Sequence, residues 1–125
     1  MTASEPKQAI AWFNEEWGQP AELALPLSDR GLQLADGLFE TILIHHNRPC
    51  LFDAHLRRWE RSCELLGMAP PPKRAWLEPL IQKAIHRLGL AQGEGALRLN
   101  WSRGDGNQRG IGLDHNAADP SRHRF

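Results

Sequence analysis

The sequence has no tyrosine, only two cysteines and only three lysines among its 125 residues. Cys50 and Cys63 show neither a CxxC spacing nor histidines at metal-ligand spacing, which argues against a metal site. Two reduced thiols are typical of a cytoplasmic protein. No apolar run approaches the roughly 20 residues of a membrane span, and the first eight residues lack the apolar core of a secretory signal. We therefore expect a cytoplasmic protein that does not enter a membrane.

The sequence also lacks net charge. Fifteen basic residues balance 15 acidic ones, the pI is about 7.0, and the basic residues are scattered. Such a chain has no overall field for nucleic acid. A hydrophobic fraction of 41% and a charged fraction of 24% are typical of globular proteins. The length suits one domain, which we expect to span residues 1–125.

Hydrophobic periodicity predicts two helices flanked by strands. The predicted strands are residues 10–13, 23–27, 38–46 with a hairpin return at 50–52, and 96–102. The predicted helices are residues 53–66 and 74–88, joined by the stiff linker MAPPP, with turns at SDRG (28–31) and in the glycine-rich segment 103–112. This order predicts an α+β fold, an antiparallel sheet with two helices on one face.

Within these elements, alternation places Glu40, Ile42 and Ile44 on one strand face and Phe39 with Leu43 on the other. We expect Asp53 to cap the first helix, and Leu66 to end its buried stripe after Leu56, Trp59 and Cys63. Pro79 is compatible with the second helix only in its first turn. Gly89 is a plausible stop.

Two groups of polar residues could bind an anion. His55, Arg58 and Ser62 form a polar line on the first predicted helix, where Arg58 is either a bidentate clamp for phosphate or carboxylate or part of a surface salt bridge. Arg98, Arg103 and Arg109 lie in or near the glycine-rich turn, which could cradle an anion or be a flexible loop. The RGD tripeptide at 103–105 is readily explained by chance. His45 and His46, being adjacent in a strand, should point to opposite faces.

Three segments in order, SDRGLQLADGLFETI, LFDAHLRRWERSCELLG and ALRLNWSRGDGNQRG, resemble the fold-type IV enzymes that use pyridoxal phosphate. That family includes class IV aminotransferases and aminodeoxychorismate lyase. Its pattern is DRG, then GDG-F-E-T, then H-x-x-R, then R-G. The fit runs from about Trp12 to Gly110, and it implies the small N-terminal domain of such an enzyme.

The resemblance implies roles for four residues. Arg58 matches the arginine that grips the cofactor phosphate, and Phe39 the aromatic residue on the substrate side. Arg98 and Arg109 match positions near the substrate carboxylate, partly across the interface of a homodimer. Glu40, on the strand face opposite Phe39, would be structural and paired with backbone or a basic neighbour.

The departures from the family are equally informative. The family's Schiff-base lysine lies in a second, larger domain, and none of Lys7, Lys73 and Lys83 fits its position. We therefore expect this chain to lack the large domain, to contain no catalytic residue, and not to hold pyridoxal phosphate by itself. A non-catalytic dimerisation or interaction module is the alternative.

Within the family, the lyase is favoured over the aminotransferase. Phe39 lacks the hydroxyl found at that position in D-amino acid aminotransferase, and Ile111 replaces the histidine that follows the loop arginine there. The expected reaction is the elimination of pyruvate from aminodeoxychorismate, with transfer of an amino group from an amino acid as the other possibility.

Overall fold

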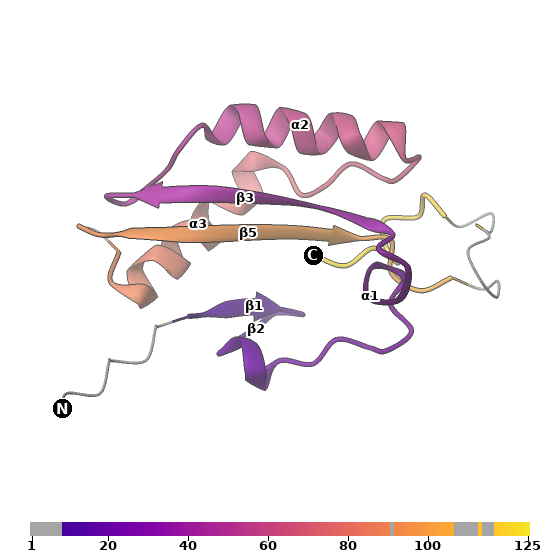
Figure 1. Cartoon of the computed structure of the whole chain (residues 1–125), viewed down its shortest axis with the longest axis horizontal. Helices are drawn as coiled ribbons and strands as arrows, with labels where there is room; N and C mark the ends of the chain where they lie inside the picture. Colours follow the sequence, from indigo (N-terminus) through magenta and orange to yellow (C-terminus); the bar gives the residue numbers. More distant parts are fainter. Residues whose placement is uncertain (1–8, 91, 107–112, 114–116) are drawn as a thin grey trace.

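The computed structural model describes residues 9–90, 92–106, 113 and 117–125. Within them the chain forms five strands, three α-helices and one 3-10 turn (Figure 1). In chain order these are β1 (Ala11–Phe13), β2 (Glu16–Gly18), η1 (Pro20–Glu22), α1 (Arg30–Leu34), β3 (Gly37–His45), β4 (Arg48–Pro49), α2 (Phe52–Leu65), α3 (Arg74–Leu88) and β5 (Glu94–Ser102). The α+β prediction is confirmed.

The main sheet has three antiparallel strands in the order β4-β3-β5. β3 and β5 pair along their whole length, from Gly37 opposite Ser102 to His45 opposite Glu94. A separate hairpin of β1 and β2 lies on the far side of β5 from β3 (Figure 1). Because β3 and β5 are long and alternate regularly, the register is fixed by which side chains must be buried.

One face of this sheet carries the core. Ile42 and Ile44 of β3 and Leu99 and Trp101 of β5 join the buried stripes of α2 and α3 in a single hydrophobic cluster. The stripe of α2 consists of Phe52, Leu56, Trp59 and Cys63, and that of α3 of Leu77, Ile81 and Ile85. Both helices therefore cover the same face, as predicted.

The other face of the sheet is open to solvent. Phe39 and Leu43 are 56% and 50% exposed, although both are large apolar residues. The alternation of buried and exposed side chains along β3 confirms the predicted division of this strand. The fold thus separates a packed face from an accessible one.

Several predicted details of the N-terminal half are wrong. Residues 23–27 form no strand, and SDRG is not a free turn, because Asp29 caps the short helix α1 and accepts the Leu32 N–H at 3.0 Å. The hairpin returns through β4 rather than through residues 50–52. Short segments like these are determined by tertiary contacts more than by local propensity.

The helices also differ in detail. The N-cap of α2 is Leu51 at φ 53° and not Asp53 as predicted. Asp53 lies in the first turn, where the helix dipole stabilises a carboxylate. Leu66 is 44% exposed and lies outside the core. Pro79 lies past the first turn of α3, whose predicted bounds are otherwise confirmed, with Gly89 as the C-cap.

Arg124 and Phe125 pack back against β5 and the tryptophan rings. Arg124 pairs with Ser102 in an isolated antiparallel bridge, with N–O distances of 2.8 and 2.9 Å. Phe125 contacts the rings of Trp12, Trp59 and Trp76 at centroid distances of 5.5 to 6.2 Å. The sequence suggested no element after Leu113, so this return of the chain onto β5 is a finding of the structure.

No helix in the described ranges is long and apolar enough to cross a membrane.

Candidate functional site

Arg58 and Glu40 form a bidentate ion pair on the helix-covered side of the sheet. Glu40 is 3% exposed because β3 points it under α2. Arg58 donates from Nε to Glu40 Oε1 at 2.7 Å and from Nη2 to Oε2 at 2.5 Å. His55, one turn earlier on α2, contacts the same Oε2 through Nδ1 at 2.8 Å. The carboxylate is therefore held by three hydrogen bonds from one helix face.

These contacts keep Glu40 ionised. The hydrogen bond from Arg58 lowers the pKa of the Glu40 carboxyl more than burial raises it, and the bond from His55 adds to the lowering. In turn, Glu40 raises the pKa of the Arg58 guanidinium. Since an ionised carboxylate only accepts, His55 Nδ1 carries the proton in this contact.

The Arg58 guanidinium is anchored along one edge only. Its side chain is 68% exposed, and Nη1 has no partner among residues 9–90, 92–106, 113 and 117–125. An arginine fixed by a bidentate carboxylate on one edge presents a rigid pair of donors on the other. Ser62, the third residue of the predicted polar line, takes no part in these bonds. The structure therefore confirms an ion pair for Arg58, and the clamp for phosphate or carboxylate stays a prediction.

Phe39 and Arg98 meet on the open face of the sheet. The Arg98 guanidinium carbon lies 3.9 Å from the centre of the Phe39 ring, a cation–π contact between neighbouring strands. Both residues line a cleft of about 570 Å³ that also includes Asn100 and Leu32. Two of the predicted substrate residues therefore lie together, and Arg109, the third, falls outside the described residues.

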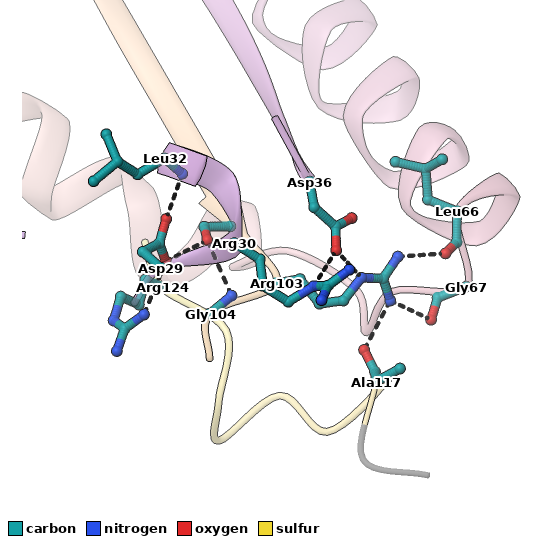
Figure 2. Close-up of polar contacts among 11 residues, drawn as sticks. Asp29, Arg30, Leu32, Asp36, Leu66, Gly67, Arg103, Gly104, Ala117 and Arg124 are labelled. Atoms are coloured by element: carbon teal, nitrogen blue, oxygen red, sulfur yellow. Dashed lines mark hydrogen bonds and ion pairs between the residues drawn. The ribbon is translucent and has the colours of Figure 1, made fainter. Parts of the chain in front are cut away.

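Arg103 does not join Arg98 as an anion ligand. It is 4% exposed and points into the protein, where Nε contacts Asp36 at 2.9 Å (Figure 2). Its other nitrogens donate to the carbonyl groups of Leu66 at 2.7 Å, Gly67 at 3.3 Å and Ala117 at 2.8 Å. Arg103 thus caps the C-terminal end of α2 and ties it to the start of β3. Because the arginine is buried, the RGD tripeptide is not displayed.

Asp36 and Asp29 complete this buried polar network. Asp36 Oδ2 also accepts from Arg30 Nε at 2.8 Å. Burial raises the pKa of Asp36, but the hydrogen bonds and charges of Arg30 and Arg103 outweigh it and leave the pKa lowered. Asp29, 1% exposed, accepts from Ser102 Oγ at 2.6 Å and from Arg124 Nη1 at 2.8 Å.

Sequence analysis missed this network. Apart from Arg124, its charged members come from SDRG, ADG and SRGD, three motifs of three or four residues that each pair a charge with glycine. The sequence pattern that could have revealed the network is the repeated occurrence of Asp and Arg beside glycine. Glycine lets backbone segments approach closely, so that side chains of opposite charge can form ion pairs there.

The histidine pair is arranged differently from the prediction. His46 lies beyond the end of β3 at φ 45°, so its ring turns back and stacks on that of His45 at 4.1 Å. His45 Nδ1 also contacts Glu94 at 2.8 Å. Within the described part of the chain, no group of three or more potential ligands is placed to hold a metal ion.

The lysines lie away from the open face. Lys73 is the exposed N-cap residue of α3 and Lys83 is exposed within this helix, which packs on the opposite side of the sheet from Phe39 and Arg98. Lys7 is outside the described residues.

Known proteins match both the sequence and the fold. The family described as Amino-transferase class IV matches residues 37–123. A bifunctional aminodeoxychorismate lyase / D-amino acid transaminase of Mycobacterium tuberculosis is 35% identical over 86 residues, which are 69% of this chain and 30% of that protein.

Solved structures agree. A hypothetical aminotransferase from M. tuberculosis in its PLP-bound form superposes with a TM-score of 0.67 at 33% identity, covering 82% of this chain and 36% of that one. The 4-amino-4-deoxychorismate lyase of Pseudomonas aeruginosa gives 0.61 at 32% identity, covering 90% and 36%. This chain spans about a third of the length of these relatives. Because the family match covers well over half of its residues, the chain belongs to the class IV aminotransferase family.

Proposed function

We propose that this chain is the small N-terminal domain of a pyridoxal-phosphate-dependent enzyme, an aminodeoxychorismate lyase in preference to an aminotransferase. The similar P. aeruginosa protein is named a lyase, and the M. tuberculosis protein is named both a lyase and a D-amino acid transaminase. Phe39 offers the substrate side an aromatic ring without a hydroxyl, which supports the same choice. The activity belongs to the longer protein that the chain's family relatives represent.

The observation that carries the proposal is the open edge of Arg58. A phosphate ester needs fixed, charged N–H donors, and Arg58 offers Nη1 from a guanidinium already held by Glu40. The described residues therefore fit the phosphate end of the cofactor. Of the described lysines, Lys73 is the N-cap residue of α3 and Lys83 lies within that helix, and both are exposed. Pyridoxal phosphate, when bound, supplies an electron sink for bond breaking at the substrate's Cα.

Phe39, Arg98 and Arg109 are proposed to meet the substrate. The stacking of Arg98 on Phe39 fixes a cation on the open sheet face, where it can pair with the carboxylate of a small-molecule substrate. Arg109 would add a second cation from the segment after β5. The apolar exposure of Phe39 and Leu43 supports burial of this face against a large domain or a second subunit.

We further propose a homodimer located in the cytoplasm, in line with two free cysteines. A stand-alone interaction module is the second candidate, favoured because none of Lys7, Lys73 and Lys83 matches the position of the family's Schiff-base lysine. The mass of the protein made by the source cells separates the two. A mass about twice the 14.1 kDa of this chain or more supports the enzyme, and 14.1 kDa supports the module.

The phosphate contact is tested by titrating the chain with pyridoxamine 5′-phosphate, which has no aldehyde to react with lysines. Pyridoxamine, without the phosphate, is the control ligand. The chain is not expected to retain the cofactor by itself, but NMR should detect weak, readily reversible binding that requires the phosphate. We expect this binding to fall on the order of tenfold in Arg58→Ala, because a charge-assisted bond is lost.

Arg57→Ala is the matched control variant. Arg57 precedes Arg58 on α2, is exposed, and makes none of the contacts to Glu40. The two variants remove the same charge from neighbouring positions. Equal loss of affinity in both would mean that the phosphate responds only to overall charge, and it would remove Arg58 from the site.

A further inference from the structure

We infer that Glu40 is a positioning residue, which holds the Arg58 guanidinium in the orientation that binds the cofactor phosphate. The inference rests on the proposed function and assigns Glu40 a part in it. It starts from an imbalance in exposure: Glu40 is 3% exposed, whereas the Arg58 side chain that it grips is 68% exposed.

Anion attraction alone does not explain a carboxylate at this place. Glu40 is ionised, and its negative charge cancels the positive charge of Arg58. A site that used only net charge to attract phosphate would bind better without Glu40. The benefit of the carboxylate must therefore lie in geometry.

The geometry supports this role. Arg58 uses Nε and Nη2, two of the three nitrogens of its planar fork, on the two oxygens of Glu40. Such a contact fixes the plane of the guanidinium and leaves Nη1 as the outward donor. An unanchored arginine would have to give up its rotamer freedom when the ligand arrives, which lowers affinity.

His55 supports the carboxylate in turn. Its Nδ1 contact to Glu40 Oε2 at 2.8 Å shares the oxygen that also accepts from Arg58 Nη2. His55 and Arg58 are three residues apart on α2, so both reach the same carboxylate from one helix face. The helix and the strand are thereby locked in the register that presents Arg58.

The test is a double-mutant cycle with Glu40→Gln and Arg58→Ala, read as the affinity for pyridoxamine 5′-phosphate at about 0.15 M salt. Glutamine has nearly the same shape but accepts only one of the two Arg58 bonds. We expect Glu40→Gln to weaken binding about fivefold through lost preorganisation. In the Arg58→Ala background the same substitution should not weaken binding, because Glu40 acts through Arg58.

Three outcomes are distinguishable. Unchanged or tighter binding in Glu40→Gln, with weaker binding in Arg58→Ala, overturns this inference and leaves the proposed function standing. Equal weakening by Glu40→Gln in both backgrounds also overturns it, since the effect would then bypass Arg58. Unchanged binding in Arg58→Ala overturns both the inference and the phosphate role. If circular dichroism shows that Glu40→Gln is unfolded, His55→Gln replaces it in the cycle. We then expect about a twofold loss of affinity for pyridoxamine 5′-phosphate, because only one of the three hydrogen bonds to Glu40 is removed.

Discussion

Arg103→Ala should be among the most damaging single substitutions of a charged residue in the described part of the chain. The change removes a guanidinium that is 4% exposed, together with its bonds to Asp36 and to the carbonyl groups of Leu66, Gly67 and Ala117. Breaking a buried ion pair typically costs about 3–5 kcal/mol. Asp36 keeps its contact with Arg30 at 2.8 Å, and Leu66 and Gly67 lie where water can reach them.

Because Asp36 keeps a partner and the carbonyl groups can bind water, we expect the free energy of unfolding to fall by about 3 kcal/mol, the low end of that range. For a domain of this size the loss corresponds to a fall of roughly 10 °C in the melting temperature. Urea denaturation followed by tryptophan fluorescence measures it. Arg103→Lys should recover about half, because an ammonium keeps the charge near Asp36 but does not form the fork that reaches several carbonyls. Arg57→Ala is the control, expected within about 0.5 kcal/mol of wild type. An Arg103→Ala chain as stable as this control would refute the assignment of Arg103 as a structural hub.

Three further predictions concern the pH dependence of stability, the packing of the last residues and the exposed face of the sheet. Stability should fall as the pH is lowered below about 6.5, because burial lowers the pKa of His123 in the folded state. It should fall more steeply below about 4.5, because the pKa values of Asp36 and Glu40 are also lowered in the folded state. A urea midpoint that stays constant down to pH 3 would contradict this. Gly104→Ala should release the end of the chain from β5, because the new Cβ would lie 1.5 Å from the Arg122 carbonyl oxygen at a residue with φ 80°. Gly93→Ala is the control, because its Cβ would meet only Leu90 Cδ2 at 3.8 Å. We expect faster hydrogen exchange at residues 122–125 in Gly104→Ala but not in Gly93→Ala. The chain alone should self-associate through the face that carries Phe39 and Leu43, with Phe39→Ser weakening the association; sedimentation that finds a monomer at high concentration, whatever the salt, would count against it.

Much of the fold follows from the sequence where the pattern is long. β3, β5 and α3 each repeat their apolar period several times, so that one arrangement buries far more surface than any other. β1 is only three residues long, yet its apolar run correctly predicted a strand at residues 10–13. β2 and α1, three and five residues long, carry too few repeats for a period to emerge. Their positions are set by contacts such as Asp29 with Ser102, which are distant in sequence.

The candidate site was predictable in its residues but not in its pairings. Phe39, Arg58 and Arg98 stand in recognisable motifs, and alternation alone separated Glu40 from Phe39. That Arg58 itself is the basic neighbour of Glu40 could not be read from the sequence, because the partners lie 18 residues apart on a strand and a helix. Arg103 was misassigned because a charged residue in a glycine-rich turn ordinarily faces solvent, and here four acceptors draw it inward.

NMR of the arginine side chains tests directly whether Arg58 binds the cofactor phosphate. A chain labelled with ¹⁵N arginine gives guanidinium signals, of which those of Arg57 and Arg58 are assigned by their loss in the two alanine variants. On addition of pyridoxamine 5′-phosphate, we expect the Arg58 signals to shift and saturate while those of Arg57 stay in place. Pyridoxamine should shift neither set of signals. Saturable shifts at other arginines, with the Arg58 signals unmoved, would contradict it.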